Sequence, residues 1–97
     1  MFRTYGGRGG IEAELRRVAA DHPGIAEVVT IGRTVRGDDL VALRVTHRPR
    51  STRQGTRPAS LFTGGQHARE WISVETVRRL ARHVVDGYGH DPAITDW

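Results

Sequence analysis

Cysteine and lysine are both absent from this sequence, and no apolar run approaches the length of a membrane span. Without cysteine the chain can form neither disulfides nor thiolate metal sites, and cysteine usage gives no clue to the compartment. The first five residues contain no continuous apolar region like that of a signal peptide. Only 37% of the 97 residues are hydrophobic, which is little for a self-sufficient core. The chain is therefore one small domain at most, or a part of a larger one.

The net charge is +4, and all fifteen basic residues are arginine. Arginine pairs well with phosphate, so one interpretation is a surface that binds phosphate or nucleic acid. The other interpretation is that the chain is encoded by a GC-rich genome, whose codon usage favours arginine over lysine. We favour the second, because the arginines are scattered and few lie beside aromatic residues. The loop at 47–58 carries four of them, and we expect it to be solvated because nothing there supplies a helix N-terminus to fix an anion.

The first elements predicted are a lead-in and a helix. Residues 1–10 hold four glycines and no periodicity, which indicates a flexible lead-in. From residue 11 apolar side chains recur with helical spacing, opposite a charged face. Pro23 and Gly24 then end the helix, because neither residue continues one easily.

A hairpin follows. Residues 26–35 are rich in β-branched side chains, and residues 40–46 alternate between apolar and polar positions. The four residues between them have turn chemistry, with Gly37 able to take φ > 0. Gly32, inside the first strand, is a candidate for a β-bulge. We therefore expect two antiparallel strands.

The last third of the chain predicts a strand and a helix. The apolar run 59–63 indicates a buried parallel strand. Apolar residues then recur with helical spacing over about 70–85, with Gly87 suited to the C′ position. Asp91 and Pro92 have the chemistry of an N-cap and a first helical residue. The order helix, hairpin, strand, helix is that of an α/β protein with a mixed sheet.

The chemistry of the chain is concentrated between the strand and the helix. Gly64 and Gly65 let the backbone take φ > 0 and let another group come close. His67 and Glu70 follow, and both are good zinc ligands. Residues three apart on a helical turn have Cβ atoms about 5–6 Å apart, so both side chains can reach one ion. Open α/β sheets bind ligands where a strand ends and a helix begins. This position favours a metal site, although a His-x-x-Glu spacing alone is weak.

The nine residues Gly64-Gly65-Gln66-His67-Ala68-Arg69-Glu70-Trp71-Ile72 resemble the first zinc-ligand motif of the zinc metallocarboxypeptidases, the carboxypeptidase A-like and T-like enzymes. The resemblance implies an α/β fragment of the mixed-sheet α/β/α zinc exopeptidase fold, with residues 11–97 forming the N-terminal part of the catalytic domain. It implies Zn²⁺ as cofactor, His67 and Glu70 as metal ligands, and Arg69 as a contact to a peptide substrate.

The resemblance also implies that several functional groups lie outside this chain. The family's third zinc ligand is a histidine far downstream, and the glutamate base and the carboxylate-binding arginines also lie downstream. His83 and His90 have unsuitable spacing for a third ligand. We therefore expect a metallocarboxypeptidase-type chain that releases C-terminal residues in the complete domain and is inactive alone. No catalytic residue is assigned within these 97 residues.

Two other functions are compatible with parts of the sequence. Related zinc deacylases of N-acyl amino acids share the His-x-x-Glu loop, but Arg69 and Trp71 favour the peptidase branch. A basic nucleic-acid-binding module lacks any recognisable reading motif. We expect a peptide substrate, no membrane partner, and self-association through an exposed sheet edge, because a strand of the family's sheet is missing from this chain. Relatives are often secreted, yet no export signal is visible, so the compartment stays open.

Overall fold

The computed structural model describes residues 8–96, which divide into two compact units. One unit covers residues 8–56 and contains α1, β1, β2 and a short 3₁₀ helix; the other covers residues 57–96 and contains α2 and α3. The expected lead-in at 1–10 lies mostly outside the described residues. No helix among residues 8–96 is long and apolar enough to cross a membrane.

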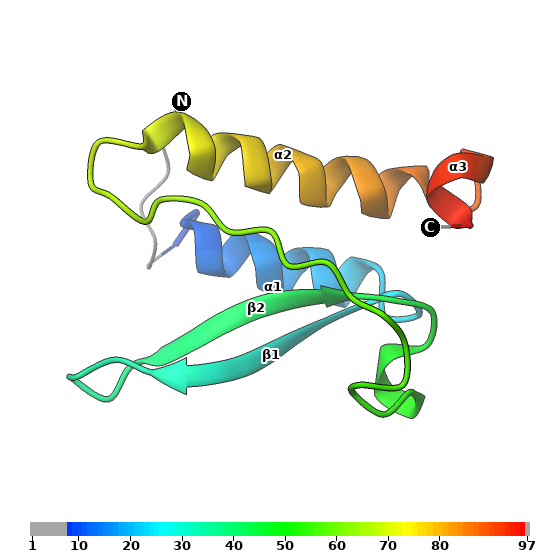
Figure 1. Cartoon of the computed structure of the whole chain (residues 1–97), viewed down its shortest axis with the longest axis horizontal. Helices are drawn as coiled ribbons and strands as arrows, with labels where there is room; N and C mark the ends of the chain where they lie inside the picture. The colour runs from blue at the N-terminus through cyan, green and yellow to red at the C-terminus, as the bar shows by residue number, and fades with distance from the viewer. Residues whose placement is uncertain (1–7, 97) are drawn as a thin grey trace. The chain divides into compact units, whose positions relative to one another are not determined.

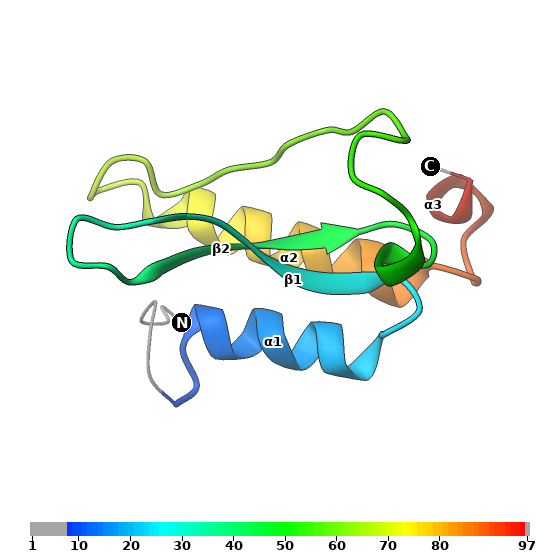
Figure 2. The same ribbon diagram turned by 90° about the horizontal axis from the view of Figure 1, so that it is seen from below.

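In the first unit, the helix α1 (Ile11–Asp21) packs on the hairpin of β1 (Ala26–Arg33) and β2 (Asp39–Val45). Figure 2 shows α1 along one face of the two strands. Four apolar residues are buried in this unit, two in α1, one just before β1 and one at its first position: Val18, Ala19, Ile25 and Ala26. The helix ends where Pro23 and Gly24 predicted, with His22 as its C-cap.

The predicted hairpin is confirmed, including its bulge. The strands pair antiparallel from Ala26 opposite Val45 to Thr30 opposite Val41, and the register then shifts so that Gly32 faces Leu40. Ile31 is the extra residue, and it is 67% exposed. Gly37 in the turn has φ +88°, a conformation that favours glycine. Figure 1 shows β1 and β2 as two arrows that lie side by side, twist, and are joined by a turn.

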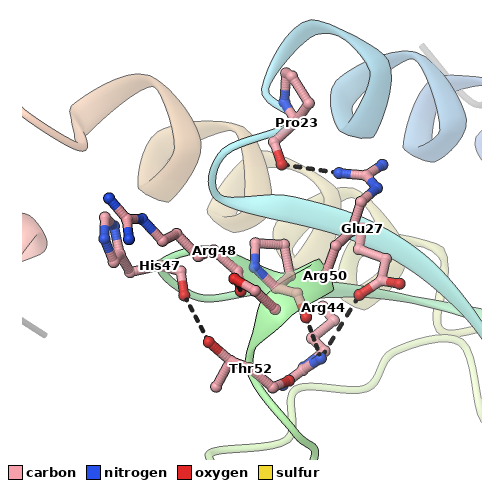
Figure 3. Close-up of polar contacts among 9 residues, drawn as sticks. Pro23, Glu27, Arg44, His47, Arg48, Arg50 and Thr52 are labelled. Atoms are coloured by element: carbon pink, nitrogen blue, oxygen red, sulfur yellow. Dashed lines mark hydrogen bonds and ion pairs between the residues drawn. The ribbon is translucent and has the colours of Figure 1, made fainter.

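The hairpin is joined to the following loop by Arg44 (Figure 3). The Arg44 guanidinium donates to the carbonyl oxygen of Pro49 at 3.0 Å and to that of Thr52 at 2.9 Å. It also lies 3.6 Å from the carboxylate of Glu27, its partner across the strands. Within the loop the residues Pro49–Ser51 form the 3₁₀ helix η1. The loop is therefore folded onto β2 by a half-buried cation.

In the second unit, the helix α2 (Trp71–Gly87) is followed by the short helix α3 (Pro92–Thr95). The predicted start at Asp91 is confirmed, because the Asp91 carboxylate accepts a hydrogen bond from the Ala93 N–H at 3.0 Å. Gly87 is the last residue of α2 rather than the C′ residue. A Cβ built there would lie 2.5 Å from Cδ1 of Ile94, so this glycine leaves room for α3.

The α/β class expected from the sequence is confirmed, but the strand expected at 59–63 is not formed. In the described residues the sheet is the two-stranded hairpin, and no strand pairs with segment 59–63. Its side chains are exposed rather than buried, with Leu61 at 82%. Strand geometry needs a hydrogen-bonding neighbour, so an apolar run without one stays irregular. Ile72 belongs to the apolar residues that recur over about 70–85 and would form the buried face of that helix, yet it is 60% exposed.

We predict that the chain self-associates through the hairpin. Neither outer edge of β1 or β2 pairs with another strand in residues 8–96, and exposed apolar side chains lie along them: Ile31, Leu40 and Val45. Unpaired edges pair with other chains unless charge opposes it. We expect light scattering after gel filtration to give a mass above 10.8 kDa that rises with concentration. Leu40→Lys should restore the monomer and Ser60→Lys, outside the hairpin, should not. A monomeric wild type at every concentration contradicts this prediction.

Candidate metal centre

The two glycines before the candidate ligands fold tightly against the start of α2. At Gly64 a built Cβ would lie 2.7 Å from the carbonyl oxygen of Ser73, closer than side-chain atoms come. Gly65 has φ +73°, in the left-handed region that favours glycine. The positive φ and the close approach of another group, both expected of these glycines, are therefore present. The group that comes close to Gly64 is the backbone of α2's first turn.

His67 and Glu70 face each other across a hydrogen-bonded turn. The Glu70 N–H donates to the His67 carbonyl oxygen at 3.0 Å, which closes the turn just before α2. Nδ1 of His67 lies 3.1 Å from Oε2 of Glu70. The other carboxylate oxygen, Oε1, accepts a hydrogen bond from the His67 N–H at 3.1 Å. The carboxylate is therefore held toward the imidazole by the backbone of the same turn.

The donor pair fits a zinc ion in type and in spacing. Imidazole nitrogen and carboxylate oxygen both bind zinc at about 2.0–2.2 Å, so two ligands of one tetrahedral ion lie about 3.3–3.5 Å apart. The observed 3.1 Å between Nδ1 and Oε2 needs only a small adjustment to reach that separation. The His67 side chain is 78% exposed and that of Glu70 is 42% exposed, so an ion can approach from solvent.

Two donors do not complete a zinc site, which uses three or four protein ligands. Among residues 8–96 no group of three His, Cys, Asp or Glu side chains could hold a metal. His83 and His90, the histidines considered as third ligands, are exposed, on α2 and in the loop that follows. The structure thus brings together His67 and Glu70 and adds no further donor to them within the described part of the chain.

Arg69 stands between the two candidate ligands and is exposed. It lines an open concavity of about 530 Å³ beside the turn. The other lining residues are Thr63, Gly64, Gly65, Gln66, Glu70, Ile72 and Ser73. An arginine side chain can hold a carboxylate by two parallel hydrogen bonds. A position beside this concavity is compatible with the substrate contact that the family resemblance implies for Arg69.

Sequence reasoning missed Ser73, which lies behind the ligand turn. Its hydroxyl donates to the Glu70 carbonyl oxygen at 2.6 Å and accepts from the Gly65 N–H at 2.9 Å. A serine in the first turn of a helix often bonds nearby backbone groups, and that is the signal the sequence contains.

A resolved pKa shift in the second unit belongs to Glu75, further along α2. The hydrogen bond from Arg78, at 2.8 Å, lowers the pKa of this carboxyl, and burial opposes the shift. The charges of Arg78 and Arg79 add to the lowering. Glu75 is thus held ionised by arginines of its own helix. It takes no part in the contacts of the ligand turn described above.

Comparison with known proteins identifies the family. Residues 11–97 match the family described as zinc carboxypeptidase. The inactive metallocarboxypeptidase ECM14 of Ajellomyces capsulatus (strain H143) is 36% identical over 95 residues, which cover 98% of this chain and 16% of the relative. The protein of the same name in Talaromyces stipitatus is 39% identical over 82 residues, covering 84% of this chain and 14% of the relative. That of Arthroderma gypseum is 42% identical over 72 residues, covering 72% and 12%.

The chain belongs to the zinc carboxypeptidase family. The resemblance drawn from residues 64–72 is therefore confirmed, and the helix, hairpin and second helix are compatible with a fragment of that fold. The chain spans less than a fifth of the length of these curated relatives. Their names describe them as inactive, so membership in the family is separate from catalysis.

Proposed function

We propose that the turn at 67–70 supplies two ligands of a carboxypeptidase-type zinc site. One observation carries the proposal: Nδ1 of His67 and Oε2 of Glu70 converge to 3.1 Å on an exposed turn. Family membership supports zinc as the ion. Because two ligands hold zinc less firmly than three or four, the chain alone is expected to bind it weakly.

We further propose that the complete domain uses this site for zinc-dependent hydrolysis of C-terminal residues from peptides. Zinc bound to such a site polarises a carbonyl and lowers the pKa of bound water. The residues of this chain would hold the ion through His67 and Glu70. Arg69, on the wall of the concavity, would hold an anionic oxygen of the peptide. The 97 residues alone are expected to release no amino acid.

Zinc titration of the untagged chain tests the ligand assignment. We expect one weak site per chain by calorimetry, and an affinity at least about tenfold lower in Glu70→Gln, which keeps the size of the side chain but removes its charge. Glu12→Gln is the matched control: it makes the same change on α1, where Glu12 pairs with Arg16 at 3.7 Å. Absence of zinc binding, or equal affinities in the two variants, contradicts the assignment.

Release of a C-terminal amino acid from a short peptide tests the hydrolytic proposal. The complete domain should release it in the presence of zinc, and the Glu70→Gln variant of that domain should not, since the ion would lose a ligand. A complete domain that binds zinc through this turn and releases nothing would match the relatives' description as inactive and overturn the hydrolytic proposal.

A further inference from the structure

Ser73 connects the two ends of the segment that carries the candidate ligands. Its hydroxyl accepts a hydrogen bond from the Gly65 N–H at 2.9 Å, two residues before His67. The same hydroxyl donates to the Glu70 carbonyl oxygen at 2.6 Å, and the Ser73 N–H donates to that oxygen at 3.1 Å. A single side chain therefore bonds to the backbone on both sides of the turn.

We infer that Ser73 is a positioning residue for the metal ligands: its hydroxyl fixes residues 65–70 so that His67 and Glu70 stay together. The inference rests on the proposed function, in which these two residues hold zinc. Groups that orient metal ligands by hydrogen bonds contribute about 10–100-fold to metal affinity. Here the hydroxyl touches neither ligand side chain and acts through the backbone that presents them.

The hydrogen bond between the Gly65 N–H and the Ser73 hydroxyl is accompanied by close contacts at Gly64 and Gly65. Gly64 lies so close to the Ser73 carbonyl that no side chain fits between them. Gly65 has a left-handed φ of +73°, and its N–H donates to the Ser73 hydroxyl at 2.9 Å. Without the hydroxyl, the Gly65 N–H would exchange its partner for water, and residues 65–70 would regain conformational freedom. The imidazole and the carboxylate would then be together for a smaller fraction of the time.

A purely structural role for Ser73 is the alternative, and α2 provides a control for it. Thr76 donates from its hydroxyl to the Ile72 carbonyl oxygen at 2.8 Å, so it makes the same kind of bond one turn of helix away. The ordinary bond of Thr76 stays within α2, whereas that of Ser73 reaches back to Gly65. Thr76→Ala thus removes a hydrogen bond within α2 and keeps the hydrogen bond between Gly65 and Ser73.

The test measures amide exchange with solvent by NMR, together with zinc affinity, in the full chain. The informative amide is that of His67, which bonds to Oε1 of Glu70 and does not touch Ser73. In Ser73→Ala we expect faster exchange at both Gly65 and His67, by at least about threefold, because the whole segment loosens. We expect zinc affinity to fall about tenfold. Thr76→Ala should leave the two exchange rates and the zinc affinity at their wild-type values. Ser73→Thr keeps a hydroxyl, so it should also show wild-type values.

Each outcome decides one of the two proposals. If Ser73→Ala speeds exchange at Gly65 alone, the hydroxyl makes a local bond only and the inference is overturned. If the wild type binds zinc, an equal zinc affinity in Ser73→Ala overturns the inference as well. If the wild type binds no zinc while His67 and Gly65 both respond to Ser73→Ala, the proposed zinc function fails and the positioning of His67 and Glu70 by Ser73 stands.

Discussion

Gly64→Ala is expected to detach the ligand segment from α2 and to weaken zinc binding by at least about tenfold. The new Cβ would meet the Ser73 carbonyl oxygen at 2.7 Å and its carbonyl carbon at 2.9 Å. These are backbone atoms of a helix, so they cannot move aside as the end of a side chain could. Forcing an atom into such a contact costs about 1–3 kcal/mol. The segment relieves this strain by moving away, and the Ser73 to Gly65 bond is lost with it.

Calorimetric zinc titration and limited proteolysis of residues 59–70 measure this effect. Gly24→Ala is the matched control, because a Cβ at Gly24 meets nothing within 4 Å and the residue has no positive φ. We expect the control to keep the wild-type cleavage rate and zinc affinity. Gly64→Ala should be cleaved faster in the segment. If the two alanine variants behave alike, the close approach of Gly64 to Ser73 does not hold the segment in place.

The parts of the fold that the sequence predicted well are those with local causes. Proline and glycine end α1 where they occur, since neither residue supports the next helical turn. The cap at Asp91 needs only its own side chain and an N–H two residues on. The bulge lies beside Gly32, and a glycine inside a strand is the local signal for it. In each case the interacting groups are close in the sequence.

The strand expected at 59–63 is wrong because a strand also depends on a neighbour that is distant in the sequence. Its apolar residues describe what the segment would contact if a sheet were present, but composition does not say whether a neighbouring strand exists. In the described residues the hairpin is the whole sheet, and Leu61 remains exposed. Partner strands are a property of the surrounding fold, so this element could not be predicted from its own residues.

The candidate site also has one part that the sequence predicted and one part that it did not. The spacing of His67 and Glu70 was enough to predict that both side chains could reach one ion, and the turn places Nδ1 and Oε2 3.1 Å apart. Ser73 could not be recognised, because a hydroxyl in the first turn of a helix is common and the Gly65 N–H that donates to it lies eight residues earlier in the chain. Supporting contacts of this kind depend on three-dimensional geometry, whereas the ligand pair depends mainly on spacing.

Arg44 was not singled out by the sequence, and its replacement by methionine is expected to have the largest effect on the stability of the first unit. Methionine keeps an apolar stem, so the change mainly removes the guanidinium. The carbonyl oxygens of Pro49 and Thr52 then lose their donor, and the Glu27 carboxylate loses its cation. Hydrogen bonds to charged groups contribute about 1.5–3 kcal/mol each. Arg44 makes two such bonds and its side chain is only 21% exposed, so we expect a total loss of about 3 kcal/mol, at the low end of their sum.

Urea unfolding followed by circular dichroism measures this loss, with Arg53→Met as the matched control. Arg53 is an exposed arginine of the same loop, and surface substitutions of this kind change stability by about 0.5 kcal/mol or less. Arg44→Lys should recover only part of the loss, because one ammonium group does not reproduce the planar fork that serves two carbonyls at once. Equal midpoints for Arg44→Met and Arg53→Met would mean that loop 47–58 folds onto β2 without the cation. In that case its prolines and the 3₁₀ turn at Pro49–Ser51, rather than Arg44, would account for its conformation.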